Sequence, residues 1–563
     1  MGSLERTIKT FSPSERFVFG ILIIALCIST FWVFVRVNQE ATTEVPIPGG
    51  TVREGVIGAP RFINPLLALS DTDRDLTALL YAGLTRPGPS GTLAPDIAKR
   101  YSISEDGTEY HFVLRDDAFF HDGVPITADD VVFTIERAQD PVVKSPRRAD
   151  WDGVRVEKVT DREVKFILQR PYAPFLENTT IGILPRHIWL NVSTQEFAFS
   201  NFNVQPIGSG PFELKNITYN ASGIPTQYEL RAFKHYTLGR PFINKFLVNF
   251  YANEEDLLRA YDAGTVTSLS AVSSAAINNR LSTNSNLLRI ALPRIFAVFF
   301  NQNKNHIFAD RNVRLALDTL LDKEHIVNEV LNGYGTIIDS PIPPGAVEGQ
   351  VLLTTSPETA EERYAEASRL LKNSGWEYDA QRNEWAKSGQ VLSFSIATAN
   401  TPELKEAAQL AAMTWTDAGI SVKVNVFETG ELNQNIIRPR DYEALLFGEV
   451  VGRGLDLFAF WHSSQKDDPG LNIAIYTNST ADTLLAKART VSNKEDRDSL
   501  YLDFENEIRK DAPASFLYAP DFLYVIPKDL KGVDIELIGT PSERFSEVHL
   551  WHTQTERIWH FFK

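Results

Sequence analysis

The longest apolar stretch of the chain lies close to its amino terminus, where the run from Phe17 to Val35 (FVFGILIIALCISTFWVFV) carries no charged side chain. A helix of this length, rising about 1.5 Å per residue, can cross the hydrocarbon core of a bilayer. The run leads into Arg36 without an A-x-A-like cleavage sequence, so it predicts an uncleaved signal anchor. Arg6, Lys9 and Arg16 precede it, which places the amino-terminal tail in the cytoplasm.

Beyond the anchor, residues 37–48 contain Thr and Pro and are followed by Gly49 and Gly50, which predicts a linker. In the body that follows, residues 110–114 and 164–168 alternate apolar and polar side chains, which is the pattern of half-buried strands. Between them, Thr127 precedes apolar side chains at helical spacing in residues 131–135, as expected for a capped helix. The first third of the body is therefore predicted to mix strands and helices.

The spacing of apolar side chains becomes helical further along the chain. Residues 313–321 carry them at i, i+3, i+4, i+7 and i+8, and residues 323–331 predict a second helix directly after. Next, residues 392–396 alternate, residues 403–418 have helical spacing, and residues 420–426 alternate again. A β-α-β unit with short loops favours parallel strands, so the sequence predicts a second α/β lobe.

The composition indicates a large folded body and narrows the classes of partner. Of the 563 residues, 43% are hydrophobic, which is enough for a packed core. Lys and Arg total 56 against 72 Asp and Glu, a net charge of −16 that opposes binding to nucleic acid or to an anionic membrane surface. The single cysteine, Cys27, excludes an internal disulfide framework and a cysteine-rich zinc site.

Common catalytic motifs are absent from the sequence. It contains no P-loop G-x-x-x-x-G-K-[ST], no H-E-x-x-H and no G-x-S-x-G, so we expect no cofactor and no enzymatic turnover. Asp71, Asp73 and Asp75 do form a D-x-D-x-D pattern of the kind that ligates metals. A calcium loop would continue with Gly and end on Glu, where this chain has Leu76 and Ala82, so a solvated loop or helix cap is favoured.

Five strings of residues carry a family resemblance. They are LAPDIAKRYSISEDG (residues 93–107), YHFVLRDDAFFHDGVPITADDVVFTIERA (110–138), PIGSGPFEL (206–214), VRLALDTLLDKEHIVNEVLNGYGT (313–336) and FWHSS (460–464). Together, and in this order, they closely resemble the peptide/nickel-type solute-binding proteins of ABC importers. The resemblance runs from about residue 49 to about residue 524, which is nearly all of the body after the linker.

This resemblance implies an α/β fold of the two-lobed, type II periplasmic-binding-protein kind. The first lobe is expected to hold an extra subdomain and to receive a returning carboxy-terminal segment. The expected segments are a cytoplasmic tail (1–16), a transmembrane anchor (17–36), a linker (37–48), a first lobe (49–295) with its subdomain (94–204), a second lobe (296–512) and the returning segment (513–563).

The family also implies ligand capture without chemistry. An open form admits the ligand, the lobes close around it, and the closed form is presented to a transporter. An extended peptide is gripped largely through its main chain, so side-chain selectivity is broad. The expectation is a membrane-anchored monomer with an extracytoplasmic body, periplasmic or on the cell surface, that captures oligopeptides or related small solutes for an ABC permease.

Ligand contacts are carried over by position in the family. They are Asp71, Thr72 and Asp73 in the first lobe, and Glu449, Arg453, Asp456 and Trp461 in the second. Relatives often place an Asp for the ligand ammonium where this chain has Gly452, next to an arginine, so Glu449 is the available acid. This departure leaves anionic, blocked or non-peptide ligands open.

Several alternatives stay open on the sequence. Trp461 fits either a core position or a stacking platform for the ligand. Glu449 and Arg453 are spaced as i, i+4 and can pair with each other instead of with a ligand. At the level of function, the alternatives are an exported metal-dependent enzyme that uses Asp71 and Asp73, and a receptor for a non-peptide solute.

Overall fold

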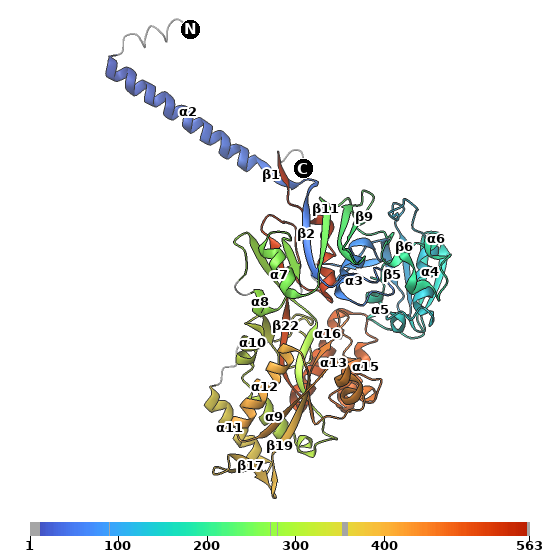
Figure 1. The fold of residues 1–563 in the computed structure, drawn as a ribbon, viewed down its shortest axis with the longest axis vertical. Coiled ribbons are helices and arrows are strands. Elements are labelled where there is room, and N and C mark those ends of the chain that lie inside the picture. The colour runs from blue at the N-terminus through green and yellow to red at the C-terminus, as the bar shows by residue number, and fades with distance from the viewer. Residues whose placement is uncertain (1–11, 89–90, 271, 278–279, 352–358, 560–563) are drawn as a thin grey trace.

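The computed structural model describes residues 12–88, 91–270, 272–277, 280–351 and 359–559. Figure 1 shows the long helix α2 (Pro13–Ala41) standing away from a body of two lobes. Ser12 caps this helix, because its hydroxyl accepts from the N–H of Glu15 at 3.3 Å and the Glu15 carboxylate accepts from the N–H of Ser12 at 2.7 Å. Residues Pro13–Val37 are long and apolar enough to cross a membrane, and most of their large apolar side chains are exposed.

The stretch expected to be a linker holds regular structure. Helix α2 continues to Ala41, and β1 (Thr42–Pro46) then pairs antiparallel with β23 (Thr555–Trp559) from the other end of the chain. Figure 1 shows β1 and the carboxy-terminal end together at the base of α2. Sequence patterning missed β1 because its hydrogen-bonding partner lies about five hundred residues away and it shows no local periodicity.

The first lobe is built on one half of a long mixed sheet. Strand β2 pairs in parallel with β11 and β12, and β9, β10 and β11 form an antiparallel meander. Its elements are β2 (Gly49–Ile57), α3 (Asp71–Leu80), β9 (Phe212–Tyr219), β10 (Pro225–Ala232), β11 (Ile243–Tyr251), α7 (Glu254–Asp262), β12 (Ser268–Ser270), α8 (Ser274–Ile277), β13 (Ser285–Ala291), η7 (Pro541–Phe545) and η8 (Val548–Leu550).

A subdomain extends from this lobe around a separate antiparallel sheet with the strand order β5-β6-β8-β7. The two predicted strands are confirmed as β6 and β8, which pair with each other, and the predicted capped helix is confirmed as α4. The elements are β3 (Thr85–Pro87), β4 (Leu93–Pro95), β5 (Ala98–Ile103), β6 (Glu109–Leu114), α4 (Ala128–Gln139), η1 (Arg148–Trp151), β7 (Arg155–Thr160), β8 (Glu163–Ile167), α5 (Phe175–Asn178), α6 (Arg186–Trp189), η2 (Phe197–Phe199) and η3 (Asn201–Asn203).

The second lobe contains the predicted β-α-β unit. Strands β19 and β20 pair in parallel on either side of α12 in the sequence, as the short loops favoured. The elements are β14 (Arg294–Phe300), η4 (His306–Ala309), α9 (Arg311–Leu320), α10 (Lys323–Leu331), β15 (Gly335–Ile337), α11 (Ala360–Asn373), β16 (Glu377–Asp379), β17 (Glu384–Lys387), β18 (Gln390–Val391), β19 (Ser393–Ala399), α12 (Pro402–Asp417), β20 (Ser421–Phe427), α13 (Thr429–Glu431), η5 (Leu432–Ile437), β21 (Ala444–Val450), α14 (Phe458–Trp461), η6 (Ser463–Gln465), α15 (Ser479–Ala488) and α16 (Lys494–Asp511).

One strand, β22 (Ala514–Pro527), belongs to both lobes. Its first half pairs with β14 of the second lobe, and its second half pairs with β12 and β13 of the first. The described chain passes between the lobes at two places, within β22 and through Leu292 and Pro293, which join β13 to β14. These neighbouring crossings form the hinge of the molecule.

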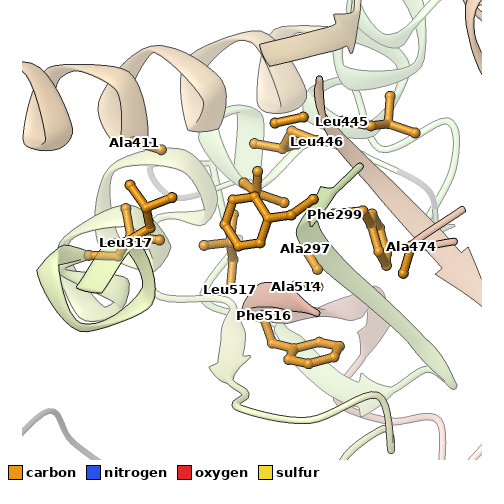
Figure 2. Packing of buried hydrophobic residues seen from close by; sticks show 14 of the residues in the cluster. Ala297, Phe299, Leu317, Ala411, Leu445, Leu446, Ala474, Ala514, Phe516 and Leu517 are labelled. Carbon is orange, nitrogen blue, oxygen red and sulfur yellow. The ribbon is translucent and has the colours of Figure 1, made fainter. Parts of the chain in front are cut away.

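Each lobe has its own hydrophobic core, as independent movement about a hinge requires. In the second lobe, Phe299 and Leu445 from paired strands are fully buried with Leu317 of α9, Ala411 of α12 and Leu517 of β22 (Figure 2). The core of the first lobe is continuous with that of its subdomain.

A buried ionic cluster fixes the returning carboxy-terminal segment to the first lobe. The Arg544 guanidinium has no exposed surface and donates to both carboxylate oxygens of Asp75, at 2.8 and 2.6 Å, and to Glu54 at 3.0 Å. The Tyr524 hydroxyl donates to the second oxygen of Glu54 at 2.9 Å. Burial raises the pKa of Glu54 to about 7 and that of Asp75 above its ordinary value, with Arg544 opposing both shifts.

Replacing Arg544 with Met is expected to lower the free energy of unfolding by about 3–5 kcal/mol, because two buried carboxyl groups lose their counter-ion. The matched control is Arg259→Met, which removes an exposed helix-surface pair with Glu255 and should cost less than about 1 kcal/mol. Urea denaturation at pH 7 measures both. Equal losses for the two variants would contradict the assignment of Arg544 as the anchor of the returning segment.

Candidate ligand-binding cleft

Two neighbouring cavities lie between the lobes. The larger, here called the outer cavity, measures about 680 Å³ and has walls that include Tyr110, Glu177 and Gly539 of the first lobe and Arg453, Arg497 and Tyr501 of the second. The hinge cavity measures about 450 Å³ and has walls that include Asp71, Pro541, Arg294, Phe296, Tyr518 and Phe522. Pro293 lines the outer cavity and its neighbour Arg294 the hinge cavity, so both cavities border the connection between β13 and β14.

The charged lining of the hinge cavity comprises Arg294 and Glu403 of the second lobe and the acids Asp71 and Asp521 of the first. Asp71 is the first residue of α3, and its side chain is 60% exposed and pairs with Arg74 at 3.3 Å. Burial lowers the pKa of Arg294, and the charge of Asp71 opposes that shift. The rings of Phe296 and Tyr518 stack with centroids 5.3 Å apart and give this cavity an apolar wall. Such a site can hold a ligand with both charged ends and apolar side chains.

Local capping determines which acid of the D-x-D-x-D pattern faces the cleft. The Ser70 hydroxyl caps α3 by accepting from the N–H of Asp73 at 3.1 Å. The Asp73 carboxylate accepts from the N–H groups of Arg61 and Phe62 at 2.7 and 2.8 Å, which fixes the loop before the helix. Asp75 is bound to Arg544, as described above, so each of the three acids has a different partner, which argues against a shared metal.

Arg453 is the central charge of the outer cavity. Its side chain is 5% exposed and lies between Glu177 of the subdomain, at 3.7 Å, and Glu543 of the returning segment, with which it forms a second ion pair. Its Nε and Nη1 groups donate to no acceptor among the described residues. Because Nε takes part in the ion pair with Glu177, Nη1 is the donor that a ligand carbonyl or carboxylate in the outer cavity could use.

A second polar contact joins the lobes beside the outer cavity. Asp456 accepts two hydrogen bonds from Arg489, at 2.8 and 2.6 Å, and a third from the Tyr172 hydroxyl of the subdomain at 3.2 Å. The N–H of Ala173 also donates to the carbonyl of Arg489 at 2.8 Å. Asp456 thus contacts the opposite lobe directly, and it does not line either cavity.

Besides Asp456, four residues carried over as ligand contacts line neither cavity. Thr72 donates to the carbonyl of Ile57 at 3.0 Å, and Asp73 holds the loop described above. Trp461 has no exposed surface, so it occupies the core position and not the stacking platform. Its indole N–H donates to Glu449 at 3.1 Å, and burial raises the pKa of Glu449 well above its ordinary value.

Strand geometry explains why Glu449 faces the core. Residues directly opposite in an antiparallel pair point to the same side of the sheet. Glu449 of β21 lies opposite the fully buried Ile295, whereas Val450, which is 59% exposed, lies opposite Arg294 on the cleft side. The i, i+4 pairing considered for Glu449 and Arg453 does not form, because this stretch is a strand followed by a turn and not a helix.

Several polar residues of the cleft gave no local signal in the sequence. Glu177, Arg294 and Glu543 stand in three separate segments, and no motif marks any of them. Only the long-range pairing of β14 and the return of the carboxy-terminal segment bring them to the same cleft. A single sequence contains no information about that proximity.

The Glu449→Gln variant is expected to keep its ligand affinity within about twofold, because burial favours the neutral carboxyl group, which an amide resembles. Trp461→Phe removes the hydrogen bond that the Glu449 side chain accepts among the described residues and should cost about 1–3 kcal/mol of unfolding free energy. Isothermal titration and urea denaturation measure the two effects. A large loss of affinity in Glu449→Gln would return this acid to the list of ligand contacts.

The outer cavity also predicts a pH dependence. Burial raises the pKa of Glu177 from 4.5 to about 7, with Arg453 opposing and Glu543 adding to the shift. Opening of the lobes would remove Arg453 and return Glu177 to water, so the closed form binds a proton more tightly than the open form. The free energy that protonation of Glu177 contributes to closure is complete below pH 4.5 and is lost as the pH rises through about 7.

Spin labels on the exposed residues Phe199 and Met413, each replaced by Cys in a Cys27→Ser background, would report the distance between lobes. Without ligand, the closed population should increase as the pH falls from 8 to 5. Glu177→Gln is the control and should show a much weaker dependence. An unchanged pH profile in that variant would assign the titration to another group.

Comparisons with known proteins agree with this architecture. A sequence profile of the bacterial extracellular solute-binding proteins, family 5 (middle region), matches residues 92–470. The oligopeptide-binding protein AppA of Bacillus subtilis is 29% identical over 496 residues, which cover 86% of this chain and 89% of AppA.

Two solved structures extend the likeness to the fold. AppA from Bacillus subtilis in complex with a nonapeptide superposes with a TM-score of 0.67 at 26% identity, covering 90% of this chain and 99% of AppA. NikZ from Campylobacter jejuni in complex with Ni(L-His) superposes with a TM-score of 0.68 at 26% identity, covering 90% of this chain and 100% of NikZ. The chain therefore belongs to family 5 of the bacterial extracellular solute-binding proteins.

Proposed function

We propose that this protein is a membrane-anchored, extracytoplasmic binding protein that captures oligopeptides between its lobes and delivers them to an ABC importer. The observation that carries the proposal is the cleft itself. Its two cavities lie beside a two-strand hinge, with an acid and an arginine on opposite lobes. Closure of such a cleft encloses a solute and returns it chemically unaltered.

The dimensions and charges of the cleft favour a peptide. Sites for single small molecules usually measure about 300–1,000 Å³, and here cavities of about 680 and 450 Å³ border the same connection between the lobes. Asp71 is exposed at the hinge cavity, where it can accept from a ligand ammonium group, and Arg453 can donate to carbonyl or carboxylate oxygens in the outer cavity. The nonapeptide complex of AppA supports the same class of ligand.

A metal chelate is the second candidate ligand, and the likeness to NikZ, crystallised with Ni(L-His), favours it. Arg453 would then contact carboxylate oxygens of the chelating amino acid in the outer cavity. The outer cavity is larger than such a compact chelate requires, which is why we place peptides first.

The membrane anchor is proposed from α2. Its apolar run is long enough to span a bilayer, and the three basic residues before it against one after it favour a cytoplasmic amino terminus. The body would then lie outside the cytoplasm, where a solute-binding protein meets its ligand before an importer does.

Native mass spectrometry of the full chain, purified in detergent and then released from it, tests the ligand. We expect peptides to be recovered with intact covalent structure. Asp71→Asn and Arg453→Gln should each weaken the binding of a recovered peptide by about tenfold or more, which corresponds to about 1.4 kcal/mol. Matched controls are Asp161→Asn and Arg382→Gln, which change exposed residues remote from the cleft.

Three outcomes would decide against the proposal in different ways. Recovery of metal chelates without peptides would favour the second candidate and leave the fold and cleft intact. Recovery of cleaved or modified molecules would favour an exported enzyme. Equal losses in the cleft variants and in their controls would place the ligand outside the two cavities.

A further inference from the structure

The two ends of the described chain meet at the membrane-proximal edge of the first lobe. Strand β1 follows the last residue of α2 without a loop, and β23 pairs with it along its whole length. The register places Trp559 opposite Thr42 and Thr555 opposite Pro46. Because the pairing is antiparallel, β23 runs toward the helix, and Trp559 is its residue nearest to the end of α2.

The height of Trp559 above the bilayer follows from the length of α2. The span candidate ends at Val37, and five further residues lead to Thr42. At about 1.5 Å per residue this separation is about 7.5 Å along the helix axis, and a tilt of the helix lowers it. The headgroup layer on each side of the hydrocarbon core is roughly 5–7 Å thick. The strand partner of Thr42 therefore lies at the outer boundary of that layer, and tilt brings it inward.

Trp559 has the exposure and the chemistry that this layer favours. Its side chain belongs to the exposed large apolar residues, with 42% of its surface accessible, although it sits in a paired strand. Tryptophan is enriched at membrane interfaces because its ring is apolar and its N–H is a hydrogen-bond donor. Phe561 and Phe562 follow in the sequence and lie outside the described residues.

A single exposed aromatic residue is common on soluble proteins and needs no special role. Phe199 of the subdomain is such a case, since it is 86% exposed in the short helix η2. Trp559 differs by its register, which pairs it with Thr42, the first residue after helix α2. Arg557 of β23 forms an ion pair with Glu44 of β1 at 3.2 Å. The charge of this arginine is therefore balanced within the two strands.

We propose that β23 is a second membrane contact, in which the Trp559 indole occupies the lipid headgroup layer beside the outer end of α2. Helix and strand together then hold the first lobe at a fixed height and tilt over the bilayer, while the second lobe moves about the hinge. The contact is apolar and hydrogen-bonded, so it does not depend on anionic lipid. This inference rests on the membrane-spanning role of α2 in the proposed function.

The test uses the full chain in phosphatidylcholine vesicles that contain no other protein. Nitroxide labels are placed, one at a time, at Trp559→Cys, Val33→Cys and Phe199→Cys in a Cys27→Ser background. Collisions with oxygen and with a water-soluble nickel chelate report the depth of each label. We expect Val33 in the hydrocarbon, Phe199 in water, and Trp559 between them, with several-fold less access to the chelate than Phe199.

A second measurement uses the chain with its Trp559 indole intact. Brominated phosphatidylcholine should quench the fluorescence of the unmodified chain more than that of Trp559→Phe, because both chains keep Trp32 inside the proposed span and only the unmodified chain has a second indole at the interface. Equal quenching, or a label at residue 559 as accessible to the chelate as that at residue 199 while residue 33 is buried, would overturn the inference and leave the membrane span standing. A water-accessible label at residue 33 would overturn both the span and the second contact.

Discussion

A single strand of fourteen residues, β22, is hydrogen-bonded into both lobes, and the relation between the lobes depends on it. With the short connection between β13 and β14, it forms the hinge. Its first-lobe half is held by the buried contact of Tyr524 with Glu54 and, through Glu54, by Arg544. Because a buried ion pair is costly to break, this end of the hinge is fixed, and movement is confined to the crossing itself.

Charges between the lobes act in two ways. Asp456 bridges Arg489 and Tyr172, which stabilises the approach of the second lobe to the subdomain. Arg453 is shared between two carboxylates, and its Nε and Nη1 groups donate no hydrogen bond to any of the described residues. A ligand oxygen that accepts from those donors would bind the closed form better than the open one, which is the differential affinity that closure requires. The same residues thus connect the geometry of the cleft to its conformational equilibrium.

Much of the fold could be predicted from local pattern. Alternation identified β6 and β8, helical spacing identified α4, α9 and α10, and the β-α-β unit gave the parallel pairing of β19 with β20. The pairing of β1 with β23 could not be predicted in this way, because a short strand without alternation is specified by its partner and not by its own residues. The return of the chain to the first lobe through β22 could be predicted only from the resemblance to the family.

The sequence by itself determined many of the helices and strands and the long apolar run of α2, since those follow from the spacing of apolar side chains. It also supplied the acids and the arginine of the cleft, but only the tertiary structure decided which of them face a ligand. Successive residues of a helix point about 100° apart and those of a strand 180° apart. Asp71 is therefore exposed while Asp73 is buried, and Val450 faces the cleft while Glu449 faces the core, according to which face the rest of the chain covers.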